Sequence, residues 1–161
     1  MYTQQTLEAL KRAEEEFVFD KFDLEDAHEL GERLRRDAAG EPKPIAIRIV
    51  LDDLMVYQSF LPGTGEDNNG WMDRKCATVR RTHHCSLMAG VERELFGEKE
   101  IWQSDEAHYA FKGGAFPIVV KGEFRGIAAI SGLPHLQDHR RLTQTIAGML
   151  GKEPILIPVE E

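Results

Sequence analysis

The chain has 161 residues, of which 42% are hydrophobic and 30% charged, and its formal net charge at pH 7 is -8. This composition is typical of a soluble globular protein, and we expect one domain spanning residues 1–161. The excess of acids disfavours a surface that neutralises phosphates, so we expect no nucleic-acid partner. The first 17 residues do not have the pattern of a signal peptide, and no apolar run approaches the ~18 residues of a membrane span. We therefore expect a cytoplasmic protein with no membrane contact.

Several segments in the first third of the chain have clear secondary-structure patterns. Residues 3–16 and a stretch capped by Asp23 carry leucines and alanines at helical spacing, which predicts two amphipathic helices. Segments 45–51 and 54–61 are rich in β-branched and other apolar residues, and the two aspartates between them predict a hairpin. Residues 17–20 are a candidate for an additional strand.

The middle of the chain predicts a long helix after a polar loop. We expect the helix to start near Trp71, with a cap from one of the side chains of residues 67–70. The polar run at residues 82–86 indicates a break into two helices. Cys76 and Cys85 lie in this helical stretch about 13 Å apart along its axis, which is too far for a disulfide, so we expect reduced thiols.

A second hairpin and a final helix are predicted further along. Strands 116–121 and 124–130 flank Gly122-Glu123, a pair that suits a type II′ turn. The last helix is expected to start at Gln137 or Asp138, and the apolar tail after it is expected to pack on the body or on a neighbouring subunit. Two hairpins with helices around them predict an α+β (α/β) domain with an antiparallel sheet of four or five strands flanked by helices.

The second hairpin has features that suit a close approach to its backbone. The double glycine at 113–114 has positive-φ freedom and no side chain, and Gly126, Ala128 and Ala129 keep the following strand thin. Pro117 cannot donate to a sheet, so it belongs on an edge strand or at a strand start. Either a helix packed on the sheet or a ligand lying over it explains these residues, and composition favours the helix.

Three side chains of the middle helix form a candidate anion site. Trp71, Arg74 and Lys75 are one turn apart and face the same way. An aromatic plane beside two cations suits an anionic or planar ligand. The same spacing fits a buried tryptophan covered by Arg and Lys stems that pair with acids, and the sequence leaves both interpretations open.

Two other groups of residues have weaker patterns. Ser131 with Asp138 and His139 suggests a serine hydrolase, but the G-x-S-x-G pattern is missing, and a strand end with a helix cap explains the serine and the aspartate equally well. His135 and His139 have the i, i+4 spacing of a metal-binding pair, but Pro134 argues against a common helix. We therefore expect no metal site.

Five motifs follow one another between about residue 15 and residue 150. They are Phe22-Asp23 through Ala27 to Leu30-Gly31, Leu61-Pro62-Gly63-Thr64, Asp67-Asn68-x-x-Trp71-x-x-Arg74-Lys75, Gly113-Gly114-x-Phe116-Pro117-Ile118, and Ser131-Gly132-Leu133-Pro134-x-x-x-Asp138-His139. Together they resemble an uncharacterised protein family within the haem-degrading (HbpS/GlcG-like) domain superfamily. The resemblance implies a profilin-like or PAS-like antiparallel sheet flanked by helices, homo-oligomeric assembly, and a role in binding haem or a small ligand.

The resemblance defines a fold better than an activity. Some superfamily members bind and degrade haem, whereas others, including a eukaryotic member of the narrower family, are linked to protein-targeting chaperone machinery. Lys112 stands where the family usually has a histidine before the double glycine, and Cys85-Ser86 stands where it usually has two serines. A lysine can hold a carboxylate but cannot act as a neutral imidazole ligand, and no haem-iron ligand maps onto a residue of this chain.

We therefore expect a cytoplasmic homo-oligomer that binds haem or a related small anionic ligand, with haem degradation as an implied activity; the sequence does not decide whether the protein is an enzyme. Trp71 is expected to stack on the ligand, and Arg74, Lys75 and Lys112 to neutralise its carboxylates. The full candidate site is Asn68, Trp71, Arg74, Lys75, Lys112, Gly113, Gly114, Phe116, Pro117, Ser131, Gly132, Asp138 and His139. The alternatives are a non-enzymatic oligomeric interaction scaffold linked to chaperone or protein-targeting machinery, which predicts no polar-lined pocket, and a hydrolase that uses Ser131.

Overall fold

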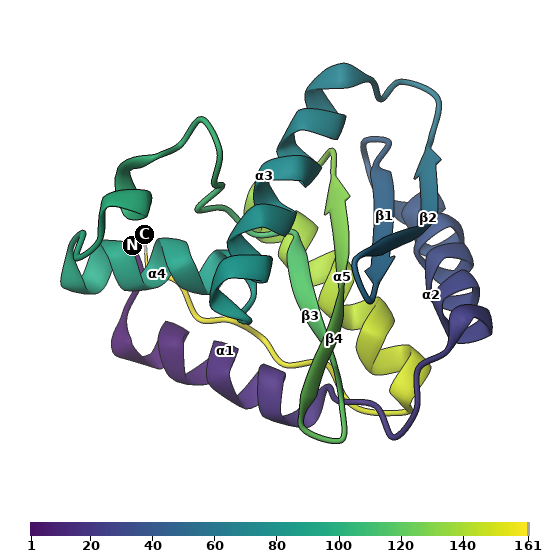
Figure 1. Ribbon diagram of the computed structural model, residues 1–161, viewed down its shortest axis with the longest axis horizontal. Coiled ribbons are helices and arrows are strands. Elements are labelled where there is room, and N and C mark those ends of the chain that lie inside the picture. Colours follow the sequence, from purple (N-terminus) through teal and green to yellow (C-terminus); the bar gives the residue numbers. More distant parts are fainter. Residues whose placement is uncertain (161) are drawn as a thin grey trace.

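The computed structural model describes residues 1–160, in which five α-helices surround a four-stranded antiparallel sheet (Figure 1). The elements in chain order are α1 (Gln4–Glu16), α2 (Leu24–Asp37), β1 (Ala46–Leu51), β2 (Leu54–Phe60), α3 (Glu66–Thr82), α4 (Ser86–Phe96), β3 (Ala115–Val120), β4 (Glu123–Ser131) and α5 (His135–Leu150). The strand order is β2-β1-β4-β3, so each hairpin contributes one inner and one edge strand. The predicted α+β fold is thereby confirmed.

The side chains of the sheet alternate between two apolar layers. Ile47 and Ile49 of β1 face the layer that contains α2 and α5, whereas Ala46 faces α3 on the opposite side. In Figure 1, α3 crosses one face of the sheet, and α5 and α2 lie against the other. Ala129 of β4 packs with Met72 of α3, so the small residues of β4 serve helix packing, as the composition favoured.

The helix starts show where local patterns were sufficient. Asp23 caps α2 as predicted, because its carboxylate accepts a 2.9 Å hydrogen bond from the Asp26 amide. The break after α3 is also confirmed, because His83 adopts a left-handed conformation with φ 62° and α4 begins at Ser86. Pro117 lies on an edge strand, which was one of its two predicted positions.

The predicted start of α3 was wrong by five residues. The helix begins at Glu66 with Gly65 as its N-cap residue, so residues 67–70 lie inside the first turns rather than before them. The Asn68 side chain accepts a hydrogen bond from the Gly65 amide, and the neighbouring Asn69 accepts one from Arg48 of β1 at 2.6 Å. These contacts hold a polar run of low helix propensity in helical geometry.

Two further local predictions were wrong. The β3–β4 turn is centred on Lys121 and Gly122, whose φ values of 50° and 81° define a type I′ turn instead of type II′. Helix α5 begins at His135 rather than at Gln137 or Asp138, because Pro134 takes the position before the first helical residue and its carbonyl accepts from both of those amides.

The two ends of the described chain meet on one side of the molecule (Figure 1). Residues 152–160, which we call the C-terminal strap, are extended and run back past α5 and α1. The Thr6 hydroxyl donates to the Pro158 carbonyl, and the Glu160 amide donates to the Met1 carbonyl at 2.9 Å. The apolar tail therefore packs on the body of its own chain, which was one of the two expectations.

Residues 17–20 do not form the additional strand that was predicted for them. Phe19 makes a single parallel bridge with Val120, so residues 17–20 touch the sheet edge at one point only. Among the helices of the described residues, none has the length and apolar character that a membrane span requires.

Candidate functional site

A pocket of about 260 Å³ lies where α3, the loop before β3, the end of β4 and the start of α5 meet. We call it the Trp71 pocket. Its lining residues are Trp71, Lys75, Lys112, Ser131, Leu133, His135 and Asp138. Five of these seven belong to the candidate site from the sequence, so the fold brings together motifs that are up to 67 positions apart in the chain.

A buried ion pair closes the inner end of the pocket. Lys75 Nζ lies 3.0 Å from Asp138 Oδ2 and donates to the Ile130 carbonyl at 2.9 Å, and the two side chains are 3% and 2% exposed. The other Asp138 oxygen accepts from the Leu133 amide at 3.0 Å. Burial lowers the pKa of Lys75 and raises that of Asp138, because removal from water disfavours both charges, and their mutual attraction opposes this effect.

This ion pair corrects the role expected for Lys75. The sequence prediction gave Lys75 the task of neutralising a ligand carboxylate, but its ammonium is already engaged by a carboxylate of the protein. The interpretation in which the lysine pairs with an acid therefore holds for this residue. Asp138 does not occupy the N-cap position of α5 either, because it lies in the first turn and reaches across to α3.

The double glycine allows the loop before β3 to contact the protein itself. Gly114 has φ +128°, and a Cβ atom there would lie 2.5 Å from Lys75 Nζ. A Cβ atom on Gly113 would lie 2.6 Å from the His135 carbonyl oxygen, and the Gly113 amide donates to His135 Nδ1 at 3.0 Å. The close approach that the glycines permit is thus filled by α3 and α5.

The outer part of the pocket carries the Trp71 ring and the Lys112 cation, and Arg74, which is not a lining residue, packs against the ring. The Arg74 guanidinium lies 4.2 Å from the centroid of the Trp71 ring, and Arg74 Nε donates to the Gly70 carbonyl. Lys112 is exposed at the rim. Burial, together with the nearby Lys112 charge, lowers the pKa of His135 to about 4, so this imidazole is neutral at pH 7.

The polar residues at the end of β4 support the pocket wall. The side-chain amide nitrogen of Asn68 donates to the Ser131 carbonyl at 3.2 Å and lies 3.5 Å from the Ser131 hydroxyl. A Cβ atom on Gly132 would clash with the Pro44 carbonyl, which explains a glycine in this tight passage. Asn68 and Gly132 therefore position the pocket without lining it.

Three residues of the candidate site lie elsewhere. Phe116 is buried in the layer between the sheet and α5, and Pro117 lies within edge strand β3, so neither lines the Trp71 pocket. His139 faces a different cavity, beneath the C-terminal strap. Successive side chains of β3 point to opposite faces of the sheet, and successive side chains of α5 point in different directions around the helix. These three side chains therefore point away from the Trp71 pocket.

The geometry does not support a serine hydrolase. Among the described residues, Ser131 contacts Asn68, Asp138 is bound by Lys75 and the Leu133 amide, and neither nitrogen of His139 has a hydrogen-bond partner. A nucleophile, base and orienting acid are therefore not aligned. His135 and His139 do share α5, contrary to the prediction, but residues 1–160 contain no cluster of three or more metal-ligating side chains.

Two pocket residues were missing from the prediction. Leu133 supplies an apolar wall, and His135 covers the double-glycine loop. The signal for His135 was its place directly after Pro134, which begins a helix more often than it interrupts one. The pocket is lined by polar side chains, which the interaction-scaffold hypothesis predicted to be absent.

A layered antiparallel sheet flanked by helices, with a pocket at the strand ends, defines an α+β domain, and comparisons with known proteins assign its family. The model of the family described as haem degrading protein HbpS-like matches residues 22–147, and the chain belongs to this family. A UPF0303 protein of Rhizobium meliloti is 34% identical over 152 residues, which cover 91% of this chain and 92% of that protein.

Solved structures share the fold of this chain. The crystal structure of the Ybr137w protein superposes with a TM-score of 0.80 and 28% sequence identity, and the match covers 90% of this chain and 87% of that one. The crystal structure of a PduOC:heme complex gives a TM-score of 0.69 at 17% identity and covers 78% of this chain and 93% of that one. The second likeness concerns the fold alone.

Proposed function

We propose that the chain binds a small anionic ligand at the Trp71 pocket, with haem as the candidate that its family suggests. The observation that carries the proposal is that the exposed Lys112 and the ring of Trp71 line the same pocket. Within residues 1–160, the ion pairs include neither Lys112 nor Arg74, so both charges remain available to a carboxylate or phosphate. The Trp71 ring offers a planar surface in the same pocket as Lys112.

Haem meets only part of this chemistry. Its two carboxylates suit Lys112 and Arg74, and the family description and the PduOC:heme complex support haem as a candidate. The pocket offers no iron ligand, because His135 accepts a hydrogen bond at Nδ1 and its neutral ring therefore carries its proton on Nε2. The volume is also below the roughly 300–1,000 Å³ of typical small-molecule sites. The residues thus fit the acidic edge of a porphyrin, not its metal, and we derive no step of haem degradation.

Titration with two porphyrins tests the proposal. Haemin and iron-free protoporphyrin IX carry the same carboxylates, so we expect their dissociation constants to agree within about threefold when stacking and ion pairing dominate. Quenching of tryptophan fluorescence and the absorbance of the porphyrin measure both. The double variant Arg74→Gln/Lys112→Gln is expected to weaken both ligands by about 10-fold or more, since each charge-assisted hydrogen bond contributes roughly 1.5–3 kcal/mol.

Arg80→Gln is the matched control, because Arg80 is an exposed arginine of the same helix that lies outside the pocket and pairs with Asp53. It should leave both affinities unchanged. Haemin binding that is 100-fold tighter than that of the metal-free ring, or a double variant with wild-type affinity, contradicts the proposed site. Homo-oligomeric assembly stays a prediction, and light scattering of the same samples tests it.

A further inference from the structure

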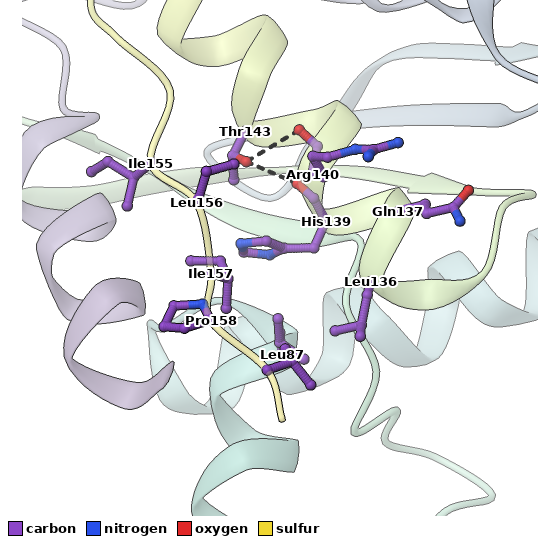
Figure 2. A pocket seen from close by; sticks show the side chains of 11 residues that line it. Leu87, Leu136, Gln137, His139, Arg140, Thr143, Ile155, Leu156, Ile157 and Pro158 are labelled. Carbon is purple, nitrogen blue, oxygen red and sulfur yellow. Dashed lines mark hydrogen bonds between the residues drawn. The ribbon is translucent and has the colours of Figure 1, made fainter. Parts of the chain in front are cut away.

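A second cavity lies on the other side of α5, beneath the C-terminal strap (Figure 2). Its volume is about 570 Å³, which is within the range of sites that hold small molecules. The walls come from one residue of α4, five of α5 and the strap: Leu87, Leu136, Gln137, His139, Arg140, Thr143, and Ile155 to Val159. We call it the strap cavity. It shares no lining residue with the Trp71 pocket.

One polar group in this largely apolar setting has nothing to bind. His139 is 2% exposed, and neither Nδ1 nor Nε2 has a hydrogen-bond partner among the described residues. The nearby Thr143 hydroxyl is turned toward the carbonyls of His139 and Arg140, as Figure 2 shows, and does not serve the ring. Buried polar side chains nearly always have a partner, so an unpartnered imidazole in the wall of a cavity is a candidate site for the polar group of a ligand, which has to displace the side chains that cover the ring nitrogens.

The state of the ring limits what that molecule can be. Burial lowers the pKa of His139 to about 4, so at pH 7 the ring is neutral and presents one N–H donor and one nitrogen lone pair. A carboxylate would find no charge at this depth, and the Arg140 side chain extends away from the ring in Figure 2. A hydroxyl group can satisfy either ring nitrogen without bringing a charge into an apolar space.

A bound metal ion explains the ring less well. A histidine that binds a metal almost always donates its other N–H to an oxygen acceptor, which fixes the ring. His139 has no such acceptor among residues 1–160, and its aromatic neighbour Phe116 lies 6.4 Å away between centroids. The apolar walls favour instead an uncharged ring or chain as the body of the ligand.

We propose that the strap cavity binds a neutral, largely apolar small molecule of the phenol or aryl alcohol class, whose hydroxyl group hydrogen-bonds to the imidazole of His139. Leu87, Leu136 and Ile157 contact its apolar body, and the strap forms the outer wall. This site is independent of the anionic ligand proposed for the Trp71 pocket.

A pair of probes isolates the hydroxyl group. 2-Naphthol and naphthalene have the same aromatic body, and calorimetric or fluorescence titration at pH 7 gives their dissociation constants. We expect 2-naphthol to bind about 10-fold tighter to the wild type, because only it pairs with the imidazole. In His139→Phe the difference is expected to shrink to about twofold or less. His108→Phe, an exposed histidine outside the cavity, should keep the wild-type ratio.

A second measurement needs no variant. In the wild type, 2-naphthol should shift the ring ¹⁵N resonances of His139, whereas naphthalene should move them much less.

The variant Arg74→Gln/Lys112→Gln should bind 2-naphthol normally, which separates this site from the Trp71 pocket. The proposal is overturned if the wild type binds both probes with equal affinity or binds neither. It is also overturned if His139→Phe keeps the preference for 2-naphthol and 2-naphthol leaves the His139 resonances of the wild type unchanged.

Discussion

His139 should make the fold sensitive to mild acid, and His139→Phe should remove much of that sensitivity. The pKa of His139 is lowered from 6.5 to about 4, mainly by burial. Between these values the unfolded chain binds a proton that the folded chain does not, so stability falls as pH falls through this window. From pH 7 to pH 5 the two pKa values correspond to a loss of about 2 kcal/mol from this one group.

Urea unfolding followed by circular dichroism at pH 7 and pH 5, at one protein concentration, measures this loss. The wild type should lose about 2 kcal/mol more than His139→Phe between the two conditions. His135 also has a lowered pKa, but it is half-exposed and is present in both proteins, so its effect cancels in the comparison. His108→Phe is the control and should behave as the wild type. If wild type and His139→Phe lose the same free energy, the imidazole of His139 is not buried in its neutral form.

Three further predictions follow from contacts around the Trp71 pocket and the two thiols. Lys75→Met leaves the Asp138 carboxylate buried without its partner, so it should lower the free energy of unfolding by about 3–5 kcal/mol in urea titrations. The double variant Lys75→Met/Asp138→Leu removes both charges and should recover part of this loss. Equal stability of the two variants contradicts the prediction. Gly114→Ala places a side chain at φ +128° and should lower the melting temperature by about 2–10 °C, and an unchanged melt would show that the loop adapts freely. Burial raises the pKa of Cys76 to about 11 and that of Cys85 well above its usual range. At pH 7.5, both thiols should therefore react with a disulfide reagent at least about 100-fold more slowly in the folded protein than in the urea-unfolded protein. Rapid labelling of the native protein would refute their burial.

Periodicity predicted most of the fold, because the alternation of a strand and the stripe of a helix are local properties. The errors occurred where distant contacts decide. Helix α3 begins early because Asn68 and Asn69 bind Gly65 and Arg48, and no local pattern contains those partners. The error at the start of helix α5 was local instead, because we interpreted Pro134 as an obstacle to the helix and it is the residue directly before the first helical residue.

The motifs indicated which residues come together more than what they contact. Trp71 and Lys112 do line one pocket, but composition could not show that Lys75 is paired with Asp138. Asp138 and His139 are neighbours in the sequence, yet consecutive residues of a helix point about 100° apart. One side chain therefore faces the Trp71 pocket and the other the strap cavity, and only the register of α5 against the sheet decides which.

The central pairing of β1 with β4 has a consequence for how the protein folds. Leu51 pairs with Gly126 and Ala46 with Ser131, 75 and 85 positions apart in the chain, whereas each hairpin closes over a two-residue turn. Closing the long loop costs about 3 kcal/mol more in chain entropy than closing a hairpin. The hairpins can therefore form early as separate units, each with an unpaired inner edge that is open to wrong partners until β1 pairs with β4. Substitutions that weaken the pairing of β1 with β4 should slow folding and favour aggregation during refolding more than they speed unfolding.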